Sequence, residues 1–235
     1  MKPVAIFQTA PSDGPGHFAA YLSSRAIGYR VIRLDEGMAV GTDPRAYSGI
    51  GLMGGAMSVN GDLPWIPPLI ELIRRAIEGD VPVIGHCLGG QLMSKALGGA
   101  VTASPAKEIG WGMVRIEDND IARRWFGDIR SFRAFQWHGE SFAIPDAAVR
   151  IATGEHCINQ AFVVGDKHLA MQCHVEMTVQ SVRQWCNEGH EEIAASRSPA
   201  VQVPAVIEED VDAKVEALRV IADRLYDRWS KGLVR

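Results

Sequence analysis

The stretch Val81–Gly99 places the tightest constraint on what this chain can fold into. A short apolar run, VPVI, ends abruptly at GHCLG, and an amphipathic stretch then runs to Gly98-Gly99. A reactive residue between two glycines, at a turn from strand to helix, is typical of a nucleophile elbow. The glycines are needed because the turn strains its central residue and leaves no room for neighbouring side chains. The pattern predicts that Cys87 is a nucleophile, with its thiolate stabilised by the free amides that begin the next helix.

A buried structural cysteine is the competing interpretation of Cys87. Free cysteine is among the most buried residue types, and this one lies between an expected core strand and an expected core helix. The choice between the two therefore depends on what the rest of the chain supplies.

The chain up to Gly99 alternates strands with helices. Short apolar runs end at turns rich in glycine or proline, and stripes of apolar residues at helical spacing separate them. We expect strands at Val4–Phe7, Val31–Leu34, Gly49–Met53 and Val81–Ile84, and helices at His17–Ala26, Pro67–Gly79 and Gly90–Gly99. This rhythm predicts a doubly wound α/β fold, in which a mostly parallel central sheet carries helices on both faces.

Beyond Gly99 the strands follow one another directly, which favours antiparallel or mixed pairing. We expect them at Gly112–Ile116, Phe132–Gln136, Val149–Ala152, Gln160–Val164 and His168–Gln172. A tight turn at Gly165-Asp166 would join the last two.

The C-terminal part is predicted to be helical around one break. Thr178–Ala194 is expected to form a helix, and SRSPAVQVP, residues 196–204, forms a break after it. Apolar residues from Val211 to Trp229 then recur at steps of three and four, which predicts an amphipathic helix docked on the core. We therefore expect one domain at residues 1–195, followed at residues 196–235 by a linker and a C-terminal helix packed on that domain.

Composition and charge are those of an ordinary globular protein. The net charge of -4 gives no reason to expect nucleic acid or an anionic membrane as partner. No apolar stretch approaches the roughly 20 residues that span a bilayer. The 4 cysteines lack C-x-x-C spacing, which predicts free thiols in a reducing compartment and a cytoplasmic location.

A second reactive segment is AMQCHVE, residues 170–176. An apolar strand ends near His174, and residues two apart in an extended chain share one face, so Glu176 can reach the imidazole. A carboxylate there would fix the tautomer of the ring and leave its other nitrogen for a nucleophile. By itself H-x-E is also common as a surface pair, but together with an elbow cysteine it predicts a Cys-His-Glu triad.

A third segment, MGGAMSV, follows the strand expected at Gly49–Met53. Paired glycines at the end of a strand can present backbone amides to a developing oxyanion, and Leu88 would supply the second amide. A flexible turn is the alternative for these glycines. The Pro11–Gly16 loop is expected at the same edge of the sheet, either lining the substrate mouth or forming an ordinary turn.

Five segments together resemble the class I, or triad-type, glutamine amidotransferases. GHCLGGQ is similar to their nucleophile motif G-x-C-x-G-x-Q, QCHVEMT to their F-H-P-E motif, and MGGAMSV to their oxyanion strand. EIGW at residues 108–111 and WHGE at residues 137–140 match two further landmarks, all in family order between Val4 and Gln180. The chain looks like a stand-alone protein similar to the amidotransferase domain of GMP synthase, and the resemblance implies a flavodoxin-like sheet.

The resemblance implies a role for each matching residue. Cys87 would be the nucleophile, His174 the general base and then the general acid, and Glu176 the group that orients it. Gly55 and Leu88 would offer the oxyanion amides. The substrate would be held by residues from three segments, with His138 shaping the cleft from a loop: Gly54, Gln91, Trp137, His138, Gly139 and Glu140.

Three positions depart from the family pattern. Val175 replaces a proline, and valine does not fix φ, so the approach of Glu176 is less constrained. Smaller residues at Cys173 and Gly90 would change the room around the substrate. The adjacent pairs His86-Cys87 and Cys173-His174 lack the spacing of zinc sites, so we expect neither a metal nor a cofactor.

The function implied is that of a glutamine amidotransferase or glutaminase. It would hydrolyse the γ-amide of glutamine through a γ-glutamyl thioester on cysteine, and ammonia would pass to a separate synthase or acceptor protein. The alternative is a stand-alone hydrolase of γ-glutamyl peptides or γ-glutamyl amines that uses the same triad. Either interpretation expects glutamine or another γ-glutamyl compound as ligand, and a homo-oligomer is left open.

Two further interpretations come from other classes of protein. PfpI-type cysteine hydrolases and chaperones share the elbow but carry histidine directly after the nucleophile, where this chain has Leu88. A non-catalytic regulatory subunit could use the same scaffold, but the presence of Cys87, His174 and Glu176 together argues against it.

Overall fold

A nine-stranded mixed sheet covered by helices on both faces forms the protein, in a computed structural model that describes residues 2–234. The strand order is β2-β1-β3-β4-β9-β8-β7-β5-β6. The strands are β1 Val4–Gln8, β2 Tyr29–Arg33, β3 Gly49–Leu52, β4 Val83–His86, β5 Val101–Ile116, β6 Ser131–Phe142, β7 Ala148–Gly154, β8 Ala161–Val164 and β9 His168–Met171. The helices are α1 Gly16–Ser24, α2 Ile66–Glu78, α3 Leu88–Ala96, α4 Asp120–Phe126, α5 Val179–Glu188, α6 His190–Ala195, α7 Pro204–Glu208 and α8 Val211–Ser230.

Strands β2, β1, β3, β4 and β9 are parallel and form the half of the sheet that carries the reactive segments. Strands β1, β3, β4 and β9 are buried along their whole length, as expected for strands covered on both faces, whereas the edge strand β2 is partly exposed. In β1, Val4 and Ile6 belong to the core that α1 and α8 cover, whereas Ala5 and Phe7 belong to the core under α2 and α3. The doubly wound α/β fold is confirmed.

The other half of the sheet is antiparallel, as the closely spaced strands predicted. Strands β5 and β6 are much longer than the expected segments, which cover only part of each. The pairing of β5 with β6 shifts register between Ala103 and Glu108, and Pro105 lies inside that irregularity. Proline is tolerated in a strand at such a bulge, and its presence hid the first half of β5 from the sequence pattern.

The helices after β9 differ from expectation in one respect. The helix predicted at Thr178–Ala194 is two helices, α5 and α6, separated at Gly189. A Cβ at Gly189 would lie 2.2 Å from Cζ2 of Trp137, so the chain bends where the indole presses against its backbone. Helix α7 begins at Pro204, the last residue of the expected break, and was not predicted.

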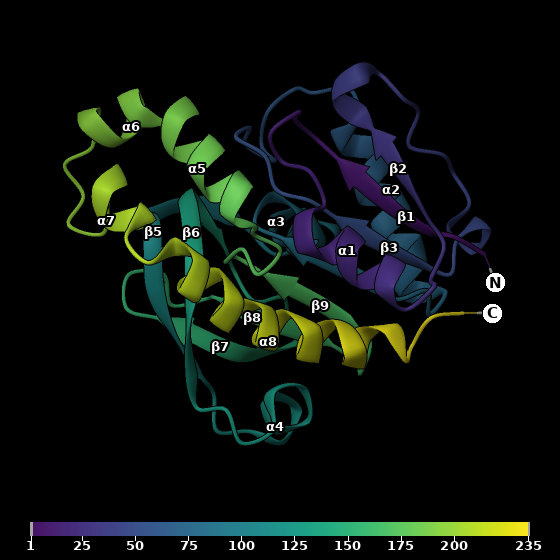
Figure 1. Cartoon of the computed structure of the whole chain (residues 1–235). Coiled ribbons are helices and arrows are strands. Elements are labelled where there is room, and N and C mark those ends of the chain that lie inside the picture. Colours follow the sequence, from purple (N-terminus) through teal and green to yellow (C-terminus); the bar gives the residue numbers. More distant parts are fainter. Residues whose placement is uncertain (1, 235) are drawn as a thin grey trace.

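Helix α8 crosses one face of the sheet (Figure 1) and confirms the predicted C-terminal helix. Its inner face is buried in the same core as α1, through Val215, Leu218, Leu225 and Trp229 among others. No helix among residues 2–234 is long and apolar enough to cross a membrane. The 4 cysteines are free and buried.

Candidate active site

Cys87 lies in a sharp turn between β4 and α3, with φ 49° and ψ -107°. The two flanking glycines allow this turn because the chain crosses itself closely there. A Cβ at Gly85 would lie 2.5 Å from the carbonyl carbon of Gly89, and a Cβ at Gly89 would lie 2.4 Å from the carbonyl oxygen of Leu52. The local geometry is therefore that of the predicted elbow, with the sulfur at the start of α3.

His174 follows the neighbouring parallel strand, so it reaches the same edge of the sheet as Cys87. Strands β4 and β9 pair with His86 opposite Met171, and the chain beyond each strand leads directly into the site. The amide of His174 donates to the carbonyl of Phe135 at 2.9 Å, which fixes the backbone against β6. Its Nδ1 lies 2.5 Å from Oε1 of Glu176.

Glu176 reaches the imidazole although Val175 replaces the family's proline. The carbonyl of Glu176 accepts from the amide of His17 at 2.8 Å. Gly16 makes this approach possible, since its φ is 44° and a Cβ there would meet the same carbonyl oxygen. The start of α1 thus holds Glu176 in place without help from a fixed φ.

Electrostatic attraction couples the protonation of His174 to that of Glu176. Burial opposes the imidazolium form of His174, but the Glu176 carboxylate and the Cys87 sulfur raise the pKa of His174 well above its ordinary value. Burial also opposes ionisation of Glu176, yet His174 and then His86 lower the pKa of Glu176 to about 2. The Nε2 atom of His174 is buried and has no hydrogen-bond partner among the described residues, so it is free to exchange a proton with another group.

Two residues behind Glu176 were missed by the sequence analysis. His86 Nε2 lies 3.9 Å from Glu176 Oε2 and 3.1 Å from the hydroxyl of Tyr226 in α8. Burial lowers the pKa of His86 against the opposing pull of Glu176. His86 directly precedes the nucleophile, but nothing in the sequence places Tyr226 near it, because the contact bridges 140 positions.

The sulfur of Cys87 faces a cavity of about 210 Å³ that His174 and Gly55 also line. The side-chain amide of Gln172 donates to Sγ at 3.4 Å, and Sγ lies 3.8 Å from the carbonyl oxygen of Trp137. Ser12 and Asp13, from the Pro11–Gly16 loop, form part of the cavity wall. That loop therefore lines the mouth rather than forming an ordinary surface turn.

Gly55 lines the same cavity as Cys87, and a hydrogen bond holds the preceding residue, Gly54. The hydroxyl of Thr9 donates to the carbonyl of Gly54. Because a trans peptide points its C=O and N–H in opposite directions, the amide of Gly55 points away from Thr9. The amide of Leu88, at the first position of α3, has no partner within the helix. These two amides are the candidate oxyanion donors.

Of the predicted substrate residues, one lines the cavity and the others lie behind its wall. Trp137 lines the cavity. Gln91 is buried, and its amide nitrogen donates to the carbonyl of Glu140 at 3.1 Å and to Oε1 of Gln172 at 3.3 Å. It therefore supports the β6 backbone, where Gly139 and Glu140 follow Trp137. Gly54 allows a close approach, since a Cβ there would lie 2.9 Å from Cε1 of His174.

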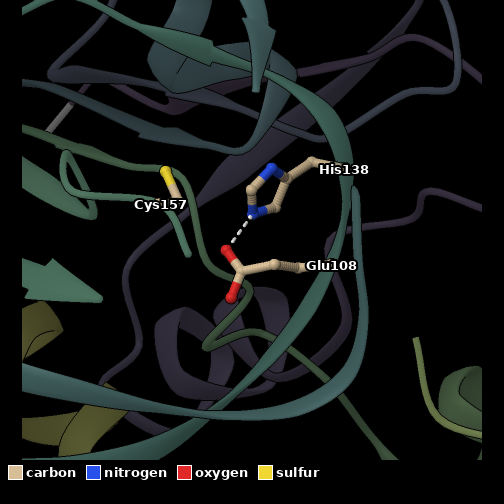
Figure 2. A group of neighbouring side chains, drawn as sticks. All are labelled: Glu108, His138 and Cys157. Atoms are coloured by element: carbon tan, nitrogen blue, oxygen red, sulfur yellow. Dashed lines mark ion pairs between the residues drawn. The ribbon is translucent and has the colours of Figure 1, made fainter. Parts of the chain in front are cut away.

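His138 is not a loop residue, and that expectation is wrong. It lies within β6, where successive side chains point to opposite faces, so it turns away from the side of Trp137. Figure 2 shows its ring directed at Glu108, with Nε2 3.1 Å from Oε2, and Cys157 beside the pair. The ligand atoms of these three buried residues lie within 4.8 Å of one another.

A carboxylate, an imidazole and a thiol are all ligands that zinc accepts. Burial, followed by the Glu108 charge, raises the pKa of Cys157 to about 12, and its thiol lies 3.6 Å from the carbonyl of Asn159. The nearby amide of Gln160 also approaches Glu108 at 3.4 Å. Glu108 and His138 are paired positions of β5 and β6, and neither ring nitrogen of His138 has a hydrogen-bond partner among the described residues.

The two small residues that depart from the family pattern do not enlarge the cavity. A Cβ at Gly90 would lie 2.6 Å from the carbonyl oxygen of Met171, so the glycine allows α3 to pack on β9. Cys173 is buried in the core with 1% exposure. The expectation that they change the room around the substrate is therefore wrong.

The far wall of the cavity comes from α5 and α6, which the sequence analysis did not assign to the site. Trp185 stands edge-on to the His174 ring, with centroids 4.9 Å apart, and its indole nitrogen donates to the carbonyl of Ser12 at 2.9 Å. Glu188, Gly189 and Glu192 complete the wall. The resemblance to the family ends near Gln180, and for that reason these residues carried no signal.

The fold and this site define an α/β protein with a cysteine elbow facing a histidine–glutamate pair. The family profile "Glutamine amidotransferase class-I" matches residues 17–185. The chain belongs to the class I glutamine amidotransferase family.

Individual relatives agree with this assignment. A crystal structure of a glutamine amido transferase from Methylobacillus flagellatus is 44% identical, with a TM-score of 0.98, and the match covers 100% of this chain and 96% of that one. Gamma-glutamyl peptidase 3 of Arabidopsis thaliana is 29% identical over 55% of each protein. One subunit of the glutamine-hydrolyzing GMP synthase of Sulfurisphaera tokodaii is 33% identical over 53% of this chain and 64% of its own length. The chain thus spans little more than half the length of the curated relatives it matches.

Proposed function

We propose that the protein hydrolyses γ-glutamyl amides by covalent catalysis at Cys87. The observation that carries the proposal is the shared cavity, in which the elbow sulfur and the unpartnered Nε2 of a carboxylate-bound histidine face the same space. The raised pKa of His174 favours an imidazolium, which pairs with a thiolate on Cys87.

The reaction would proceed in two balanced steps. The thiolate attacks the γ-carbonyl carbon, and the amides of Gly55 and Leu88 stabilise the oxyanion. His174 gives its proton to the departing amine, the C–N bond breaks, and a γ-glutamyl thioester remains on Cys87. His174 then takes a proton from water, the hydroxide displaces the thiolate, and glutamate leaves. Glu176 holds the ring in the orientation that both transfers need.

Glutamine is the first candidate substrate, with ammonia passing to a separate synthase or acceptor protein. The relative named as one subunit of a GMP synthase supports an arrangement in which the synthase is another chain. We also infer a reducing, cytoplasmic setting from the free thiols.

The second candidate is a stand-alone hydrolase of γ-glutamyl peptides or amines. The relative named as a γ-glutamyl peptidase supports it, and so does the cavity wall, because α5 and α6 enclose the space beyond His174 with residues of this chain. In this case the amine product takes the place of ammonia and leaves without a partner.

Glutamate release from glutamine, γ-glutamyl amines and γ-glutamyl peptides tests the proposal. The native protein should release glutamate from at least one of them. Cys87→Ala should abolish release, because the attacking atom is removed. Cys186→Ala is the matched control, since this cysteine is buried in α5 and does not line the cavity, and it should retain activity. Equal rates for the native protein and Cys87→Ala would overturn the proposal.

A further inference from the structure

The cavity has a reacting end and an outer end. Cys87, His174 and Gly55 form the reacting end. The outer end is built by α5 and α6, through Trp185, Glu188 and Glu192, and Asp13 of the loop after β1 lines the cavity near His174. The imidazole that protonates the leaving amine is 1% exposed, and its free Nε2 faces this space. We therefore assign the outer end to the leaving group of the substrate.

Three carboxylates line the cavity, those of Asp13, Glu188 and Glu192, but the carboxylate of Glu192 is already neutralised. Lys107 Nζ lies 2.6 Å from Glu192 Oε1, and the Trp137 indole nitrogen donates to Oε2 of Glu192 at 2.9 Å. This carboxylate therefore belongs to the framework that holds the Trp137 ring against α6.

Asp13 and Glu188 have no lysine or arginine partner among residues 2–234. Asp13 accepts a hydrogen bond from Ser12 at 3.2 Å, and Glu188 from the amide of Gln184 at 2.8 Å. Burial raises the pKa of Asp13, the opposing effect of His174 lowers it, and the neighbouring Glu188 raises it further. Both carboxylates line the same cavity and neither has a lysine or arginine partner, so a cation that enters the cavity would stabilise their charged forms.

The aromatic walls suit the same occupant. Trp137 and Trp185 meet edge to face, with centroids 5.9 Å apart, and both line the cavity. Indole faces attract ammonium groups, and the attraction adds to that of the carboxylates.

We propose that this cavity selects γ-glutamyl amides whose leaving amine bears a second, positively charged ammonium group, as in a mono-γ-glutamyl diamine. The inference rests on the proposed function and narrows its substrate class. The γ-carboxamide lies at Cys87, the alkyl chain runs past Trp185, and the distal ammonium lies between Asp13 and Glu188. Hydrolysis breaks the amide C–N bond, His174 protonates the nitrogen, and water supplies the atoms that complete glutamate and a free diamine.

The same charges disfavour γ-glutamyl peptides. The leaving group of a γ-glutamyl amino acid carries a carboxylate, which would lie close to Asp13 and Glu188 and be repelled. The inference thus separates amine substrates from peptide substrates of one and the same hydrolase.

Three substrates test the inference. Two have the same length, γ-glutamyl-1,4-diaminobutane and γ-glutamyl-n-pentylamide, in which a methyl replaces the ammonium. The third, γ-glutamylglycine, is shorter and ends in a carboxylate. The value of kcat/KM should be about tenfold higher for the diamine than for the pentylamide, and lowest for γ-glutamylglycine, as expected for one or two partly solvated ion pairs. Raising the salt concentration should reduce the ratio of diamine to pentylamide.

Variants locate the effect. Glu188→Gln should reduce the diamine-to-pentylamide ratio about fivefold, and Asp13→Asn should reduce it as well. Glu78→Gln, an exposed carboxylate at the end of α2, is the matched control and should leave the ratio unchanged. Both measurements are ratios, so a change in the reaction step common to the substrates cancels.

The outcomes distinguish a failure of the cation inference from a failure of the proposed hydrolase function. Equal kcat/KM for diamine and pentylamide, a preference for γ-glutamylglycine, or a ratio unchanged by Glu188→Gln would overturn the cation inference and leave Cys87-dependent hydrolysis intact. Hydrolysis of glutamine, with none of these three substrates cleaved, would also overturn the cation inference and leave Cys87-dependent hydrolysis intact. Failure of all these substrates with folded native protein would overturn the proposed function and this inference together.

Discussion

The backbone at Cys87 is the most unusual feature of the chain at the scale of single residues. A positive φ of 49° with a ψ of -107° is a conformation that costs non-glycine residues about 1–3 kcal/mol. The close contacts made by Gly85 and Gly89 compensate this cost, because they let β4 and α3 approach closely enough to bury the turn. The strained conformation of Cys87 is therefore tolerated because of Gly85 and Gly89, two residues that carry no reactive group.

Replacing Gly89 with alanine tests this dependence. The new Cβ would lie 2.4 Å from the carbonyl oxygen of Leu52, so we expect Gly89→Ala to lower the free energy of unfolding by about 3 kcal/mol. Gly28→Ala is the control, because no atom lies within 4 Å of a Cβ there. Denaturant titration of both variants makes the measurement, and equal stabilities would show that the elbow does not need its glycines.

The role of a residue could be predicted from the sequence where it depends on neighbours in the chain. The roles of Cys87 in the elbow, and of His174 and Glu176 two positions apart, were predicted for that reason. His86 and Tyr226 were not, because their proximity to Glu176 depends on where α8 crosses the sheet.

At the scale of the elements, strand β9 leads into the site at its carboxyl end and carries a buried histidine at its amino end. Its carboxyl end leads to Gln172 and His174 in the site. Its first residue, His168, is buried on the opposite edge of the sheet, where Nδ1 accepts from the amide of Val83 at 3.3 Å. Burial lowers the pKa of His168 to about 4.

The lowered pKa of His168 predicts a specific acid sensitivity. Between its ordinary value of 6.5 and about 4, the unfolded chain binds a proton at this histidine and the folded chain does not. Stability should therefore fall as the pH is lowered through this range. His168→Gln should flatten the fall relative to the native protein, whereas His190→Gln, at an exposed position, should not. Thermal unfolding measured across this pH range makes the comparison. Identical slopes for the native protein and His168→Gln would contradict the assignment.

Element boundaries were predictable where hydrophobic period and turn residues agreed. The parallel strands met both conditions. The first half of β5 did not, because Pro105 and the charged residues Lys107 and Glu108 interrupt its pattern, while pairing with β6 maintains the strand. The bend at Gly189 likewise arises from contact with Trp137, a residue of a distant strand.

At the scale of the whole molecule, α8 ties the site to the core. Trp229 is fully buried, packs edge-on against Phe18 of α1 with centroids 5.4 Å apart, and lies over Gly49 of β3. The same helix brings Tyr226 to His86 behind the triad. Helix α8 therefore contributes to the stability of the region that holds Glu176.

Truncation of Trp229 measures that contribution. Trp229→Ala removes a large, fully buried side chain and should lower the free energy of unfolding by about 4 kcal/mol. Val220→Ala, on the outer face of the same helix with 63% exposure, should change it by less than about 0.5 kcal/mol. A small loss for Trp229→Ala would mean that α8 is not part of the cooperative core.

The measurement that tests the central claim most directly is covalent labelling by a glutamine-analogue affinity reagent, followed by peptide mapping. We expect one adduct, on Cys87. An excess of any γ-glutamyl compound that the protein hydrolyses should prevent this adduct. The other three cysteines should remain free, because burial raises the pKa of Cys173, of Cys157 to about 12 and of Cys186 to about 11. An adduct on one of these three, or a folded protein that stays unlabelled at Cys87, would contradict the account.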